Sequence, residues 1–171
     1  MRNLMHFVDP VSIQFFKLFL AMTLGGIIGT ERAVLARQAA GTRTFGLVSL
    51  GACLFVVVGN FVDTSYTGLV NLDPMTIAAA IVTGIGFIGG GLIIFRGDTV
   101  HGTTTAAGLW IAAGLGLTVG FGLYSLAIFA TILTLIMFVG MWYLENKFKN
   151  WFDGRVKVEP PAHTTQTQEN P

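Results

Sequence analysis

Side chains that could take part in chemistry are few in this chain, and most of them fall in three short segments. Residues 29–32 are Gly-Thr-Glu-Arg, residues 41–44 are Gly-Thr-Arg-Thr, and residues 96–105 contain an arginine, an aspartate, a histidine and four threonines. If the fold brings these segments together, arginines and a helix N-terminus could hold a phosphate or a carboxylate, and acidic side chains could hold a cation. The predicted polar cluster comprises Glu31, Arg32, Arg43, Thr44, Arg96, Asp98, His101, Thr104 and Thr105.

A structural role competes with each of these chemical roles. Ion pairs of Glu31 with Arg43, and of Arg32 with Asp98, would stabilise the fold at a membrane interface without any ligand. A metal site would use Glu31 and Asp98, with His101 beside them, and Mg²⁺ is the candidate ion because one or two carboxylates can suffice for it. The sequence has no histidine pair at helical spacing and no repeated acidic motif to support such a site. It also lacks the Walker A, G-x-S-x-G and H-E-x-x-H motifs, so no enzyme activity and no certain cofactor are expected.

Residues 84–91, GIGFIGGG, match the G-x-G-x-x-G motif of nucleotide-binding loops. That motif needs an acidic residue about 20 positions further on, but no Asp or Glu occurs between Asp98 and Glu145. We therefore expect a membrane helix whose glycines pack closely against the next helix. Three consecutive glycines also leave open a break in the helix at residues 89–91. The glycines assigned to packing or to a break are Gly84, Gly86, Gly89, Gly90 and Gly91.

The composition indicates a membrane protein. Only 11% of the 171 residues are charged and 53% are hydrophobic, whereas about 25% of the residues of a soluble protein are charged. A water-exposed surface cannot be covered with so few charges, so most of this surface must face lipid or other protein. The lipid bilayer is therefore an expected partner, and nucleic acid is not.

Uncharged runs predict an all-α, compact bundle of five transmembrane helices, since a bilayer core needs about 20 apolar residues. Gly120-Phe121-Gly122 is expected to turn between the last two helices. Lys17 is expected to extend towards the membrane surface. Asp73-Pro74 is expected to begin the third helix, and one of the threonines 103–105 to cap the fourth. The predicted helices are residues 10–30, 44–62, 75–95, 103–119 and 123–144, within a domain of residues 1–146.

The basic residues predict the orientation in the membrane. Eight of the ten Lys and Arg residues fall on one side if the N-terminus is outside, and basic loops favour the cytoplasmic side. The orientation is therefore N-out and C-in, with the polar cluster at the cytoplasmic face and Asp73 outside. Residues 147–157, KFKNWFDGRVK, predict an interfacial basic and aromatic segment, and residues 158–171 a disordered cytoplasmic tail.

Taken in order, the motifs of this chain resemble the MgtC/SapB family of bacterial inner-membrane proteins. The resemblance implies a five-helix domain that is often dimeric and is associated with magnesium limitation, phosphate and ATP homeostasis, and survival inside hosts. It also implies a short member, because larger members add a C-terminal domain similar to ACT domains. The matching stretches are GIIGTER (26–32), AGTRT (40–44), LVSLGA (47–52), DP (73–74), IAAAIVTGIGFIGGGLI (77–93), GTTTAAGLW (102–110) and GLGLTVGFGLY (114–124).

Two positions depart from the family pattern, which usually has an Arg two residues after the Asp-Pro and a Gln in the next turn. Thr76 and Ala80 stand there in this chain, so a polar network that used those two side chains would be reduced.

Two functions remain open at this point. The first is a non-enzymatic regulator of another membrane protein, for which the resemblance suggests the F-type ATP synthase or a transporter. The second is a small dimeric transporter or channel for a cation or other small solute, with its site at the cytoplasmic helix ends and with Glu31 and Asp98 as cation partners. A homodimer is expected, and a lipid or anion site that uses Arg43 and Arg96 is compatible with either function.

Overall fold

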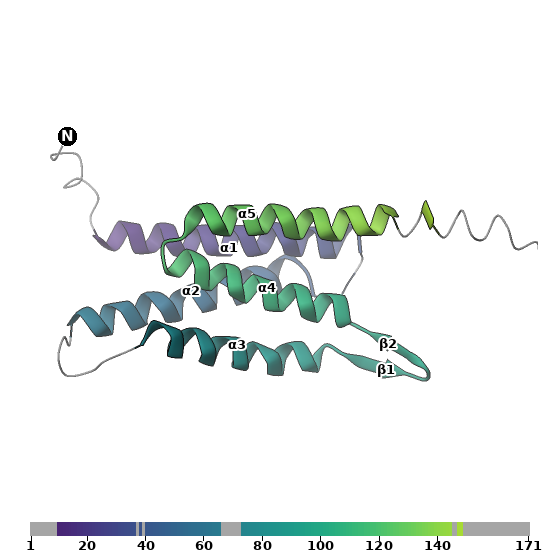
Figure 1. Cartoon of the computed structure of the whole chain (residues 1–171), viewed down its shortest axis with the longest axis horizontal. Coiled ribbons are helices and arrows are strands. Elements are labelled where there is room, and N and C mark those ends of the chain that lie inside the picture. Colours follow the sequence, from purple (N-terminus) through teal and green to yellow (C-terminus); the bar gives the residue numbers. More distant parts are fainter. Residues whose placement is uncertain (1–9, 37, 39, 66–72, 145–146, 149–171) are drawn as a thin grey trace, which may run out of the picture.

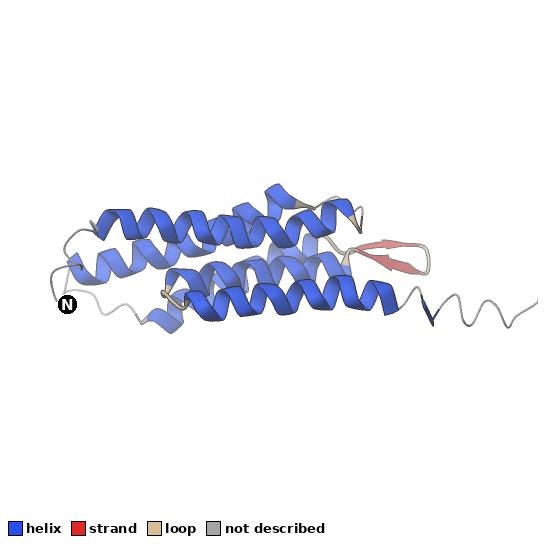
Figure 2. Cartoon of the chain, turned by 90° about the horizontal axis from the view of Figure 1, so that it is seen from above, coloured by secondary structure: helices blue, strands red, loops and turns tan. Residues whose placement is uncertain are grey.

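Five helices and one short β-hairpin make up the part of the chain that the computed structural model describes, residues 10–36, 38, 40–65, 73–144 and 147–148. A π-helical turn, Ile136–Gly140, continues the last helix, and α-helix resumes at residues 141–144. The helices lie side by side along one axis, and the hairpin projects from one end of the bundle (Figure 1; Figure 2). The elements are α1 Pro10–Val34, α2 Thr42–Ser65, α3 Pro74–Gly91, β1 Ile94–Arg96, β2 Thr99–His101, α4 Thr103–Gly120 and α5 Tyr124–Leu135.

Each of the five helices, with α5 extended to Leu144, is long and apolar enough to cross a membrane. The prediction of an all-α, five-helix membrane protein is therefore confirmed. The N-out orientation stays a prediction. The predicted tail, and the predicted interfacial segment beyond residues 147–148, lie outside the described residues.

α4 is the central helix of the bundle. It packs against α1, α2, α3 and α5, and 61% of its membrane-spanning window is buried, against 11% in α3 and in α5. Small residues such as Ala112, Ala113 and Gly116 let the neighbouring helices come close to it. The outer helices expose large apolar side chains, as expected for helices that face lipid.

Glycines make the close contacts among α1, α2 and α4. A Cβ added at Gly25 would lie 2.6 Å from the backbone oxygen of Phe45, and one added at Gly29 would lie 2.6 Å from the backbone oxygen of Gly41. A Cβ at Gly116 would meet the backbone of Ser49. At these positions any side chain would push two helices apart.

Most glycines of α3 do not pack closely against α4, although the sequence predicted that they would. A Cβ added at Gly84, Gly86, Gly90 or Gly91 would have no atom within 4 Å, and only at Gly89 would it approach α4, 3.8 Å from Ala106. Spacing alone shows that a helix has a face of small residues, but it does not show which neighbour that face meets. The close packing occurs instead where α2 meets α1 and α4.

The predicted third helix extends to residue 95, but α3 ends at Gly91. The backbone is helical through residues 89–91, so the glycines lie at the end of the helix and not at an internal break. Ile93, Ile94 and Phe95 follow, and such β-branched and aromatic residues favour a strand. The strand turns back at Gly97, whose φ of 58° suits glycine.

The predicted turn between the last two helices is confirmed. Gly122 has a φ of 83° and donates to the Val119 carbonyl (2.9 Å), while Leu123 donates to the Thr118 carbonyl (3.0 Å). These two bonds form a Schellman motif, which satisfies carbonyls at the end of α4.

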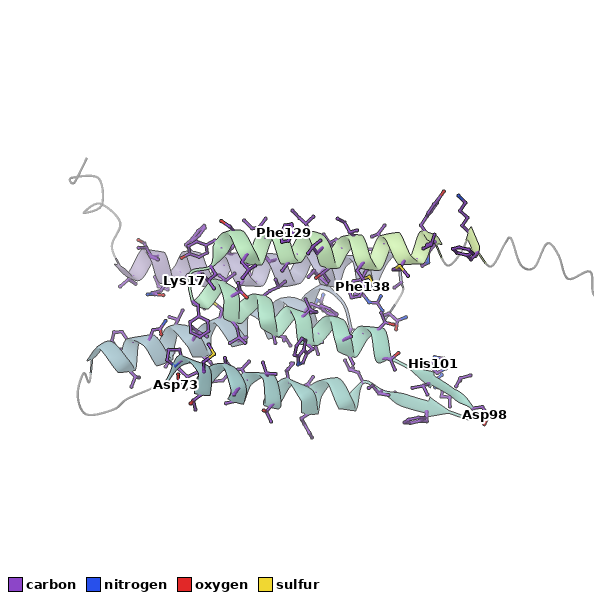
Figure 3. The ribbon with its side chains drawn as sticks, in the orientation of Figure 1. Lys17, Asp73, Asp98, His101, Phe129 and Phe138 are labelled. Atoms are coloured by element: carbon purple, nitrogen blue, oxygen red, sulfur yellow. The ribbon has the colours of Figure 1, made fainter. Side chains whose placement is uncertain are left out.

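Lys17 of α1 adds a hydrogen bond at the end of α4, because its Nζ donates to the Gly120 carbonyl at 3.0 Å (Figure 3). Lys17 thus stabilises the C-terminus of α4, where a cation is favourable. The sequence predicted only that Lys17 extends towards the membrane surface, and it did not predict this contact.

Candidate functional site

All elements that carry the predicted polar cluster meet at one end of the bundle (Figure 1). Glu31 and Arg32 lie near the end of α1, Arg43 and Thr44 lie at the start of α2, and Thr104 and Thr105 lie at the start of α4. Glu31, Arg32 and Thr105 are buried, whereas Arg43 and Thr104 are exposed and Thr44 is half-buried. Burial therefore divides the predicted cluster into an inner group and an outer group.

Arg32 is the centre of the inner group. Its side chain is only 7% exposed, and its Nη2 donates to Thr105 Oγ1 at 3.1 Å. Thr105 Oγ1 in turn donates to Oε1 of Gln38 at 3.5 Å. The guanidinium carbon of Arg32 lies 4.8 Å from the centre of the Phe138 ring, a distance typical of a cation–π contact. Arg32 thus joins α1 to α4 and to the end of α5.

Phe138 is a member of this site that the sequence did not indicate. It belongs to the π-helical turn, and π-helical turns occur frequently at functional sites. A Cβ added at Gly108 of α4 would lie 2.9 Å from Cζ of the Phe138 ring, so glycine at this position leaves room for the ring. The small residues of α4 were a visible signal, but nothing in the sequence linked Gly108 to a phenylalanine thirty positions away.

Glu31, the neighbour of Arg32 on α1, differs from it in its contacts within the described residues. The residue is 8% exposed, and its Oε2 is buried without a hydrogen-bond partner in the described part of the chain. Neighbouring side chains on a helix point about 100° apart, and the hydrogen bond of Arg32 goes to Thr105. A buried carboxylate without a partner is unfavourable, which makes Glu31 the clearest candidate for a ligand-dependent residue in this inner group.

The two predicted ion pairs are not formed among the described residues. Arg43 is exposed while Glu31 is buried, and Asp98 lies at the tip of the hairpin, away from α1 (Figure 3). For Asp98 the cause is the β-hairpin, which carries its polar residues outward, where a loop close to the bundle end was expected. Arg96, Asp98 and His101 are all exposed on it.

The expected metal set of Glu31, Asp98 and His101 is likewise not assembled. No group of three His, Cys, Asp or Glu side chains that could hold a metal ion occurs within the described residues. Two oxygen ligands from protein can be enough for Mg²⁺, but Glu31 and Asp98 are on different elements and are not brought together.

The helix caps give one confirmation and one correction. Asp73 is the N-cap of α3, as predicted, and its Oδ1 accepts from the Met75 amide at 3.0 Å. Thr76, at the position where the family usually has Arg, donates to Asp73 Oδ2 at 3.3 Å. At α4, however, the N-cap is Gly102 with a φ of 89°, and no threonine side chain caps the helix. Thr105 is used for the contact with Arg32 instead.

Comparison with known proteins gives consistent results. The sequence profile described as the MgtC family matches residues 18–147. A protein named putative magnesium transporter YhiD, from Escherichia coli strain K12, is 42% identical over 136 residues, which cover 78% of this chain and 63% of that protein. A protein named MgtC, from Brucella abortus strain 2308, is 44% identical over 112 residues, which cover 66% of this chain and 44% of that protein. The chain thus spans less than two thirds of the length of these relatives, and no solved structure matches it.

Proposed function

Because the chain belongs to the MgtC family and has five membrane-spanning helices, we propose that it is a non-enzymatic regulator in the bacterial inner membrane. It binds another membrane protein, an F-type ATP synthase or a transporter, and takes part in magnesium, phosphate and ATP homeostasis. The observation that carries this proposal is an open apolar groove between α2 and α3, of about 800 Å³.

The groove suits a transmembrane helix of a partner protein. Thr76 is the only polar side chain among its lining residues, and the Thr76 hydroxyl is already bonded to Asp73. Ala80 and Gly84, four residues apart on α3, both line it, and a Cβ at Gly84 would meet no atom within 4 Å. Small residues at this spacing let a second helix approach closely, and close packing is a main source of helix association in lipid.

The composition of the core supports binding over transport by a single chain. The buried polar residues of the described chain are Glu31, Arg32, Ser49, Thr105 and Thr131. Thr131 donates to the Ala127 carbonyl of its own helix. The other four lie on α1, α2 and α4, so no line of buried polar side chains runs along the described part of α3 or α5. A solute pathway would need polar groups along the length of the bundle, so transport would require a second copy.

One observation nevertheless favours the second candidate function, a small dimeric transporter or channel for a cation. Oε2 of Glu31 is buried without a partner, and buried acidic residues in membrane proteins frequently mark ion pathways. Cation flux in liposomes that contain the purified protein, lost in Glu31→Gln, would support this function and contradict the regulator.

Gly84→Leu tests the regulator, and Gly86→Leu is its matched control. Both glycines are exposed on α3 with no atom within 4 Å of an added Cβ, but only Gly84 lines the groove. The expected result is that a strain lacking the protein grows under magnesium limitation with the wild type or Gly86→Leu, but not with Gly84→Leu.

A photo-crosslinking amino acid at position 84 identifies the occupant of the groove. It should link to a membrane protein in wild-type cells, and the same probe at position 86 should link to far less of it. Links only to a second copy of the chain would show that the groove is a homodimer interface and would refute the proposed partner. Equal growth of the two leucine variants would refute a role for the groove.

A further inference from the structure

The hairpin between α3 and α4 has two unlike faces. In its antiparallel register Phe95 pairs with Val100, while Arg96 pairs with Thr99 and Ile94 with His101. Paired residues point to the same side of a sheet, and successive residues alternate. Phe95 and Val100 therefore form one face, and the opposite face contains Arg96, Thr99 and His101 together with Ile94.

The apolar face is strongly exposed. Phe95 is 73% exposed and Val100 is 47% exposed. The end of α3 also exposes apolar side chains, since Phe87 is 87% exposed and Ile88 is 46% exposed. The hairpin thus follows a helix whose end is itself apolar and exposed.

The polar face is held in place by local bonds. Thr99 Oγ1 donates to the Arg96 carbonyl at 2.9 Å and lies 3.1 Å from Nε2 of His101. The guanidinium of Arg96 has no ion pair with any described side chain, and Asp98 lies beyond it at the turn. This arrangement presents a guanidinium and a histidine on one side, which suits a phosphate oxygen.

The connections of the hairpin fix its depth in the membrane. β1 begins three residues after α3 ends, and β2 ends two residues before α4 begins, so both strands are tied to membrane-spanning helices. Open strand edges do not occur in contact with the hydrocarbon region, because their amides would lack partners. The hairpin therefore lies outside the hydrocarbon region, beyond the ends of α3 and α4 (Figure 1), and its short connections keep it close to the lipid headgroups.

We propose that this hairpin is a lipid-interface anchor. Phe95 and Val100 insert into the boundary between headgroups and acyl chains, and Arg96 binds the phosphate of an anionic phospholipid. Apolar side chains such as Phe insert at this depth in interfacial segments, and basic side chains favour anionic lipid. A lipid surface fits better than a protein partner because both strands are joined within three residues to membrane-spanning helices. This role assigns a function to Arg96 outside the buried group around Arg32.

Neighbouring positions on opposite faces provide the test. Single cysteines at Thr99→Cys and Val100→Cys are labelled with an environment-sensitive fluorophore, and the protein is placed in phosphatidylcholine nanodiscs with and without phosphatidylglycerol. Cys53 is fully buried, so the wild type serves as the labelling control. The label at 100 is expected to emit at shorter wavelength, to be quenched by lipids with a nitroxide near the headgroup, and to resist aqueous iodide severalfold better than the label at 99.

Two further variants separate the contributions of the two faces. Arg96→Gln should remove the effect of phosphatidylglycerol on the label at 100, and Phe95→Ser should weaken the quenching by nitroxide lipid in both lipid mixtures. Equal iodide quenching at 99 and 100 in both mixtures would overturn the proposal. Protection of position 100 that appears only when membrane proteins are added would also overturn it, because the face would then bind a protein.

Discussion

The contact between α2 and α4 predicts that one added methyl group at Gly116 will destabilise the protein. A Cβ there would lie 2.8 Å from Cβ of Ala52 and 2.9 Å from the carbonyl carbon of Ser49, and it would come even closer to the Ser49 carbonyl oxygen. Two of these three atoms belong to the backbone of α2, so rotation of a side chain cannot relieve the clash. Gly25 of α1 also packs against α2 at Ser49, which prevents α2 from simply moving away.

The expected magnitude follows from two opposing effects. Inserting a methyl group into a packed core costs about 1–3 kcal/mol, while alanine gains about 1 kcal/mol over glycine in a helix. Gly116→Ala should therefore lower the free energy of unfolding by up to about 2 kcal/mol. Gly114→Ala is the control in the same helix, because its Cβ would meet no atom within 4 Å. This control should be neutral or more stable than the wild type.

Unfolding in mixed micelles with increasing sodium dodecyl sulfate, followed by circular dichroism, measures the difference between Gly116→Ala and Gly114→Ala. The expected gap is about 1–3 kcal/mol, with Gly116→Ala the less stable protein. If the two variants unfold at the same detergent fraction, α2 and α4 do not pack at Gly116 as described, and the explanation of the glycines fails.

Three other predictions use the same unfolding assay. Lys17→Met should lower the free energy of unfolding by about 1.5–3 kcal/mol, because it removes a charged donor from the Gly120 carbonyl; a loss of similar size in Lys17→Arg would argue against the bond. Arg32→Ala and Thr105→Val should show a coupling energy of about 0.5–3 kcal/mol in a double-mutant cycle, and additive effects would contradict their hydrogen bond. Asp73→Ala should cost about 0.5–2 kcal/mol as a lost helix cap, with Asp73→Asn near the wild type; equal losses would show that the cap is not the cause.

Local rules predicted the parts of the fold that depend on neighbouring residues. Uncharged runs of membrane length gave the five helices, Asp73 before Pro74 gave the start of α3, and Gly122 gave the turn after α4. In each case the physical cause lies within a few residues of the feature. Such features can be predicted without knowing which helices are neighbours.

The candidate site could be predicted only in part, because it depends on contacts between distant segments. The sequence placed Arg32 and Thr105 at one end of the bundle, and the structure joins them by a hydrogen bond. The third member, Phe138, comes from the π-helical turn after α5, which is distant from both in the sequence. The hairpin was missed for a different reason. Residues 93–95 continue the uncharged run of the third helix, and a short apolar run does not distinguish a strand from a helix.

The position of α4 between two different surfaces has a consequence for the proposed functions. On one side, Ala113 of α4 lines the apolar groove of α2 and α3. On the other side, Thr105 and Gly108 of the same helix contact Arg32 and Phe138. A partner helix that enters the groove and displaces α4 would therefore also disturb the contacts of Arg32.

This connection gives a way to separate regulation from transport. In the regulator, Gly84→Leu should abolish function while Glu31→Gln should have little effect, because the groove and not the carboxylate binds the partner. In the transporter the reverse should hold, since Glu31 lies near the end of α1 and does not line the groove. A double-mutant cycle between Thr105→Val and Gly84→Ala, a smaller change that should only weaken growth, would then show whether the two sides of α4 are coupled. Additive effects on growth under magnesium limitation would mean that α4 acts only as a rigid support between them.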